Sequence, residues 1–223
     1  AKLSEICQAA FPYTPVINNE SINRNLVSVT SQNSRTKVVT ALLGKELNAN
    51  LGFTGAGQEV SIMRSLLVRT GILTGIDSDP QICLEPEDEK LKKVFRIIYE
   101  AMAGATAESP CSFSRVYHHL TAPELGVGLK RGVIPLFLAA FFHAHKKGAV
   151  VFCRGVEAKL CAELLNAVNL HPEDYTVYLE EQSQEQQRYL AGLEELFSAQ
   201  IVVEERGYNS LAYLVYAMNR WYM

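Results

Sequence analysis

The five histidines are the side chains best suited to bind a metal or to transfer protons, and their spacing keeps them apart. His143 and His145 are two residues apart in a predicted helix, which separates them by about 200° around the helix axis. His118 and His119 are adjacent and also diverge, and the chain has no HExxH motif. We therefore predict no metal site and interpret the histidines as structural or solvent-facing residues.

Phosphate-loop and nucleophile motifs are the next candidates for chemistry. The glycine-rich segment Gly52–Gly57 (GFTGAG) lacks the lysine and the preceding apolar strand of a Walker loop, so we interpret it as a turn. The chain contains no GxSxG motif, and no pair of carboxylates stands out from ordinary surface charge. We predict no cofactor and no enzyme active site within this chain.

A second glycine-rich segment, Gly126–Gly132 (GVGLKRG), directly precedes a predicted helix. Free backbone N–H groups at a helix start can hold an anion, and this segment adds two cations to them. The alternative is that the glycines serve only the turn. The candidate residues for binding an anion or a nucleic acid are the basic side chains of this segment and of the region after it, namely Lys130, Arg131, Lys146, Lys147 and Arg154.

Charge is segregated along the chain, although the net charge is only −3. Residues 115–159 contain seven basic and two acidic residues, whereas residues 161–205 contain ten acidic residues and only one basic residue, Arg188. Such a separation of charge produces an electric field that can orient a charged partner, and its basic part can contact DNA. The alternative is that the two regions neutralise each other in the fold.

The cysteines and the apolar runs point to an intracellular location. Five widely spaced cysteines without a CxxC motif are typical of reduced thiols. The longest apolar run, Gly132–Phe142, is shorter than the ~20 residues that a membrane helix needs. No signal peptide is recognisable, so we expect a cytoplasmic protein with no membrane partner.

Periodicity predicts a mainly α fold with a small sheet of two or three strands. Strands are expected at 149–153 and 175–179, and the apolar helix 132–147 is expected at the centre of the core, with Leu138 and Phe141 buried. The other predicted helices span 2–10, 31–47, 58–69, 88–104, 113–121, 156–166, 183–197 and 208–222.

The acidic, turn-rich connector 75–86 suggests a domain boundary. We predict an N-terminal helical subdomain over 1–86, a winged-helix-like subdomain over 87–181 and C-terminal helices over 182–223. The chain starts without Met and stops inside an amphipathic pattern, so we expect it to be a truncated piece of a longer protein. The alternative is a natural C-terminal helix that ends there.

Residues 88–179 follow the element order of a winged helix-turn-helix, with one predicted helix, 156–166, between the two wing strands. In such a fold the third helix reads DNA, and it must present polar side chains to the base edges. Here the third helix is apolar almost all round, which is typical of a buried helix. We therefore interpret the arrangement as a structural or protein-contact version of the fold.

Several short stretches together resemble a known protein family. They are Thr14-Pro15, Asn19-Glu20, Asn23-Arg24, Arg69-Thr70-Gly71, Gly126, Gly132-Val-Ile-Pro135-Leu and Leu138-Ala-Ala. This set resembles the region downstream of the P-loop domain in large bacterial ATP-binding proteins, often found in phage-defence gene neighbourhoods. Glu124-Leu125-Gly126 stands where that family has proline-tyrosine-glycine.

The resemblance covers most of the chain and implies a helical, winged-helix-containing module. Such a module would receive or transmit the state of an ATPase elsewhere in the same polypeptide, and its partners would be other domains of that parent protein. The expected function is thus that of a non-catalytic regulatory or interaction module. The alternative is a nucleic-acid-binding winged helix, with DNA as the partner.

Overall fold

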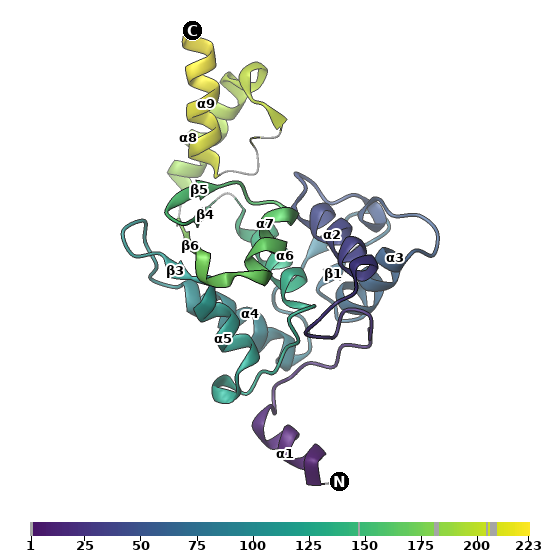
Figure 1. Cartoon of the computed structure of the whole chain (residues 1–223). Coiled ribbons are helices and arrows are strands. Elements are labelled where there is room, and N and C mark those ends of the chain that lie inside the picture. The colour runs from purple at the N-terminus through teal and green to yellow at the C-terminus, as the bar shows by residue number, and fades with distance from the viewer. Residues whose placement is uncertain (1, 147, 181–182, 204, 206–208) are drawn as a thin grey trace.

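The computed structural model describes residues 2–223 apart from 147, 181–182, 204 and 206–208. In this part the chain is mainly helical with a small antiparallel sheet (Figure 1), as predicted. The elements up to residue 102 are α1 (Lys2–Ala10), α2 (Val29–Leu43), the 3-10 turn η1 (Ala49–Gly52), α3 (Gln58–Ile62), the π-helical turn η2 (Met63–Val68), β1 (Leu73–Thr74), β2 (Gln81–Ile82) and α4 (Glu89–Met102). The later elements are β3 (Cys111–Ser112), α5 (Phe113–Thr121), η3 (Pro123–Leu125), α6 (Ile134–His145), β4 (Ala149–Cys153), β5 (Val156–Ala158), α7 (Ala162–Leu170), η4 (Pro172–Asp174), β6 (Tyr175–Leu179), α8 (Gln184–Leu196), η5 (Ser198–Gln200) and α9 (Ser210–Tyr222).

Helix α6 is the centre of the body, which confirms the predicted core helix. Its residues Ile134–Phe142 are all buried, including Leu138 and Phe141. The helix packs against α2, α4 and α7, and its aromatic rings meet neighbouring rings edge to face, as in the contact of Phe137 with Phe95 at 5.8 Å between centroids. Edge-to-face pairs add to the free energy of burial, so the aromatic content of α6 fixes its orientation in the core.

The main sheet has four strands in the order β3-β6-β4-β5, all antiparallel, rather than the two or three strands predicted. The short strand β3 pairs with β6 before the chain enters α5. The fourth strand, β5, falls where a helix was predicted over 156–166, and that prediction is wrong for its first residues. A tight turn at Arg154 and Gly155, both with positive φ, folds the chain back onto β4. Helix α7 begins only after Cys161, its N-cap.

The predicted connector 75–86 contains half of a small hairpin, in which β1 pairs with β2. Gly75 lies in its turn with φ +61°, and a Cβ there would lie 2.1 Å from the Asp79 carbonyl oxygen, so only glycine fits. One hydrophobic core includes residues from both sides of position 86, from Ile17 to Val177. The division into subdomains at that position stays a prediction, and the two parts share this core.

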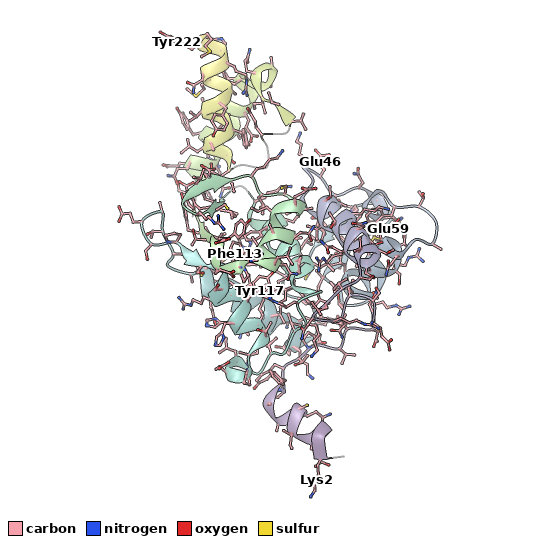
Figure 2. All side chains as sticks on the ribbon, viewed as in Figure 1. Lys2, Glu46, Glu59, Phe113, Tyr117 and Tyr222 are labelled. Carbon is pink, nitrogen blue, oxygen red and sulfur yellow. The ribbon has the colours of Figure 1, made fainter. Side chains whose placement is uncertain are left out.

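The C-terminal helices α8 and α9 pack on each other and project from the body, while α1 projects from the opposite side (Figure 1). The buried side chains of this region are Phe197, which follows α8, and Tyr213, Leu214 and Ala217 of α9, and none of them belongs to the main core. Figure 2 shows the contrast between Phe113 in the body and Tyr222 at the far end of α9. Among the described residues, no helix has the length and apolar character needed to cross a membrane.

Candidate anion-binding site

The loop that precedes α6 is held by the N-terminal segment of the chain. The Tyr13 amide donates to the Gly126 carbonyl oxygen at 2.9 Å, and the Gly128 amide donates to Thr14 Oγ1 at 3.1 Å. The Gly132 amide donates to the Arg24 carbonyl oxygen, and a Cβ at Gly132 would lie 2.1 Å from the Ile22 carbonyl oxygen. These glycines therefore allow two chain segments to approach closely.

The predicted mode of anion binding, through free N–H groups of this loop, finds little support in the geometry. The amides of Gly126, Gly128 and Gly132 donate to protein oxygens, and so do those of Arg131 (to Asn25 Oδ1) and Val133 (to the Lys130 carbonyl). Amides with intramolecular partners are not available to a ligand. An anion at this place is therefore not bound by these five amides.

The four described residues of the five predicted cations have different surroundings. Lys130 is exposed, and Arg131, half-buried, lies with its guanidinium carbon 5.5 Å from the centroid of the Tyr117 ring. Lys146 Nζ donates to the carbonyl oxygens of Gly44 and Lys45, at 3.0 and 2.6 Å, where it stabilises the C-terminal end of α2. Lys147 lies outside the described residues.

Arg154 occupies the turn between β4 and β5, and its Nη2 donates to Asp174 Oδ2 at 2.8 Å. This ion pair lowers the pKa of the Asp174 carboxyl group, chiefly through the hydrogen bond. Three of the five cations, Arg131, Lys146 and Arg154, thus interact with ring, carbonyl or carboxylate groups of the protein. Lys130 and Arg131 each line a cavity next to the loop, and Lys146 lines a different cavity together with Lys45 and Lys159.

Two adjacent cavities flank Lys130 and Arg131. The first, of about 620 Å³, lies beside Arg131 and is lined from the N-terminal segment, α5, α7 and η4. Its polar lining residues are Asn25, Ser114, Tyr117, His118, Thr121, Arg131 and Asn169. The second cavity, of about 720 Å³, lies beside Lys130 and Lys90 and shares Asn25 and Thr121 with the first. We call the first cavity the Arg131 pocket.

Tyr117 is the buried member of the Arg131 pocket. It projects from α5 within the body (Figure 2), and its hydroxyl donates to Asn169 Oδ1 on α7 at 3.1 Å. Burial raises the pKa of this phenol, and the positive charges of Arg35 and Arg131 oppose that rise. The phenol therefore stays a neutral hydrogen-bond donor at physiological pH.

Arg35 is a buried cation that sequence reasoning missed. Only 3% of it is exposed; its Nη1 donates to the Gly132 carbonyl oxygen at 3.1 Å and its Nη2 to Asn166 Oδ1 at 3.0 Å. Its Nε has no partner among the described residues. Burial lowers the pKa of the guanidinium. A buried cation normally has an acidic partner. No carboxylate of the described residues forms an ion pair with Arg35.

The histidines and cysteines offer no comparable site in the described part of the chain. His143 Nδ1 lies 2.6 Å from the Leu42 carbonyl oxygen, and the His145 ring stacks on Phe141. No group of three or more metal-ligating side chains comes together among the described residues, and the five cysteines are free thiols.

Comparison with protein-family models, with curated proteins and with solved structures gave no match.

Proposed function

We propose that the chain is a non-catalytic regulatory or interaction module of a larger ATP-binding protein, built on a winged-helix-like arrangement. Two observations support the winged-helix-like part of the proposal: the element order α4, β3, α5, α6, β4, β6, and the pairing of β6 with both β3 and β4. Strand β5 and helix α7 form an insertion in the wing. The larger ATP-binding parent rests on the sequence resemblance.

The burial of α6 is the observation that carries this proposal. In a DNA-binding winged helix the third helix lies in the major groove, where its polar side chains contact the bases. In this chain the third helix is α6, which is covered along Ile134–Phe142 by α2, α4 and α7. Such a helix supports a scaffold that contacts other proteins through its other surfaces.

The α8–α9 hairpin offers the surface for such a contact. Leu211, Val215, Met218 and Tyr222 recur every three or four residues along α9 and are all exposed. Their spacing places them on one face of the helix. Exposed acids on α8, Glu185 and Glu195, lie on the same hairpin. We expect the partner surface to be apolar with basic residues at its edge.

Separate expression of the parent protein in two pieces tests this proposal. The chain and the remainder of the parent polypeptide should form a stable complex that size-exclusion chromatography detects. The double change Val215→Glu and Met218→Glu should abolish the complex, because it places charge in the apolar face. Gln184→Glu, on exposed α8, adds charge outside that face and should leave the complex intact. An unaltered complex with the double variant contradicts the proposed contact surface.

DNA binding separates the proposal from its alternative. A nucleic-acid-binding module would lose affinity for duplex DNA steeply with salt, with a slope of about 0.9 per phosphate contact. We expect only weak binding without sequence preference, and no binding of ATP, in fluorescence anisotropy and calorimetry. Nanomolar affinity for a duplex in physiological salt, weakened by replacing Lys130 and Arg131 together, would establish the alternative.

A further inference from the structure

The Arg131 pocket is a cavity whose described lining has several polar side chains and no carboxylate. Besides Leu26, Leu170 and Pro172, it is lined by two asparagines, two hydroxyl residues, a tyrosine, a histidine and the arginine. Two carboxylates lie next to lining residues: Glu124 Oε1 is 3.7 Å from His118 Nε2, and Glu173, which contacts His171, follows Pro172. A polar cavity of this volume is large enough for a small-molecule ligand.

Arg131 has its hydrogen-bonding capacity unused. Among the described residues, its guanidinium contacts the face of the Tyr117 ring and forms neither a hydrogen bond nor an ion pair. A guanidinium carries five N–H donors in a planar fork that fits the oxygens of an oxyanion. Its backbone amide is held by Asn25 Oδ1, so the side chain starts from a fixed point at the cavity wall.

Arg35 adds a second positive charge behind the pocket. Arg35 lies close enough to Tyr117 for each group to influence the pKa of the other. The positive charge of Arg131 also acts on the pKa of Tyr117. Both arginines thus lie near the phenol, and no carboxylate of the described residues forms an ion pair with either of them. In a low-dielectric interior such a pair of like charges favours an anion between or beside them.

We propose that the Arg131 pocket binds the dianionic phosphate group of a small molecule. The phosphate contacts the Arg131 guanidinium directly and accepts hydrogen bonds from neutral donors of the lining, while Arg35 stabilises it through space. A phosphate monoester carries a charge of about −1.5 to −2 at neutral pH, which matches two arginines, whereas a carboxylate carries only one charge. Its three terminal oxygens also use more of the surrounding donors than a carboxylate can.

Ligand binding at this place would join parts of the chain that are distant in sequence. Asn25 belongs to the N-terminal segment, Ser114 and Tyr117 to α5, and Asn169 to α7. A phosphate that contacts several of these residues stabilises the folded state by mass action, because the unfolded chain has no such pocket. Phosphate binding in the Arg131 pocket is independent of the proposed contact with a parent protein.

Titration with inorganic phosphate at constant ionic strength tests the proposal, with binding followed by calorimetry and by the NMR signal of the Arg131 side-chain Nε. We expect saturable binding with a Kd of about 1 mM or lower. Sulfate should compete, whereas acetate should compete much less. The absence of saturable binding overturns the proposal.

Two neighbouring cations provide a matched pair of variants. Arg131→Gln should weaken phosphate binding by about tenfold or more, because it removes charge-assisted hydrogen bonds. Lys130→Gln removes the same charge one residue away, beside the second cavity, and should change the Kd by less than about threefold. Equal weakening by both variants means a diffuse electrostatic attraction and overturns the pocket.

A third variant covers the case in which Arg131→Gln does not fold. Asn169→Asp retains an oxygen that accepts the Tyr117 hydroxyl, but it places a carboxylate in the lining. Phosphate binding should then be lost, with an unchanged circular dichroism spectrum; retained binding in this variant contradicts the proposal. A short DNA duplex should not displace inorganic phosphate, and displacement by the duplex would assign the pocket to nucleic acid instead.

Discussion

Helices α6 and α8 have nearly the same length, but different interactions stabilise them. Helix α6 has no side-chain cap at its N-terminus, but nine consecutive residues are buried. Helix α8 has none of its residues buried, yet it begins with a complete capping box, in which the Ser183 side chain accepts from the Gln186 amide and the Gln186 side chain accepts from the Ser183 amide. Burial therefore forms the first helix and local hydrogen bonds form the second.

The contrast separates a scaffold from an element that can respond to a partner. An isolated helix of this length is marginal in water without tertiary packing, so α8 depends on its cap and on α9. Contacts between the α8–α9 hairpin and the body are sparse, and the hairpin has its own small apolar cluster. We expect the hairpin to open at a lower free energy than the body.

The largest effect should follow from a cavity in α6. Leu138→Ala should lower the free energy of unfolding by about 2–5 kcal/mol, because Leu138 is fully buried in a packed core. Leu211→Ala, on the exposed face of α9, is the matched control and should cost less than about 0.5 kcal/mol. Urea unfolding measures both. A loss of less than about 1 kcal/mol for Leu138→Ala would show that α6 is not part of a tight core.

Replacing a glycine by alanine should lower stability in the body and raise it in the α8–α9 hairpin. Gly132→Ala should destabilise the body by about 1–3 kcal/mol, since its Cβ meets the carbonyl oxygens of Ile22 and Arg24 at 2.1 and 2.7 Å. The backbone of the N-terminal segment must move to admit the methyl group. Urea unfolding also checks this value. An unchanged urea midpoint for Gly132→Ala contradicts the close approach of the N-terminal segment to Gly132.

Gly192→Ala should have a smaller and stabilising effect on the hairpin. Gly192 lies inside α8, and a Cβ at this position has no atom within 4 Å. Alanine therefore improves the helix by about 0.5–1 kcal/mol. Hydrogen exchange should slow in α8 while α6 is unaffected. Equal slowing in both helices would show that the hairpin and the body open together rather than as separate units.

Apolar periodicity was sufficient to predict that α6 lies at the centre of the body, because a helix that is apolar on all sides is normally buried. It failed at Val156–Ala158, where a helical pattern of residues overlaps a strand. The deciding feature there is a turn with positive φ at Arg154, a residue type that rarely adopts this conformation, and only the pairing with β4 fixes it.

The candidate site shows the same limit. Arg131 was predicted from its place before a helix, but the pocket beside it is assembled by Asn25, Ser114 and Asn169, which no local pattern connects. Arg35 is surrounded in the sequence by polar residues, a pattern that predicts an exposed cation, although the fold buries its side chain. Lys146 reads as part of a basic surface, but its ammonium group is bound to the end of α2.

The smallest effect concerns His143, which links the end of α6 to α2. Desolvation is the main cause that lowers the pKa of this imidazole, and the charge of Lys146 lowers it further, while the bond to the Leu42 carbonyl opposes both. The unfolded chain therefore binds a proton at a higher pH than the folded chain does. This contribution to stability is complete above the ordinary histidine pKa of about 6.5 and is lost as the pH falls below it. His143→Gln should weaken the pH dependence of the free energy of unfolding, measured with urea, below about pH 6.5. Lys146→Gln should narrow the pH range over which this free energy changes, because it removes a charge that lowers the pKa of His143. An unchanged slope in the His143→Gln variant would mean that the imidazole is as well solvated at this junction as in the unfolded chain.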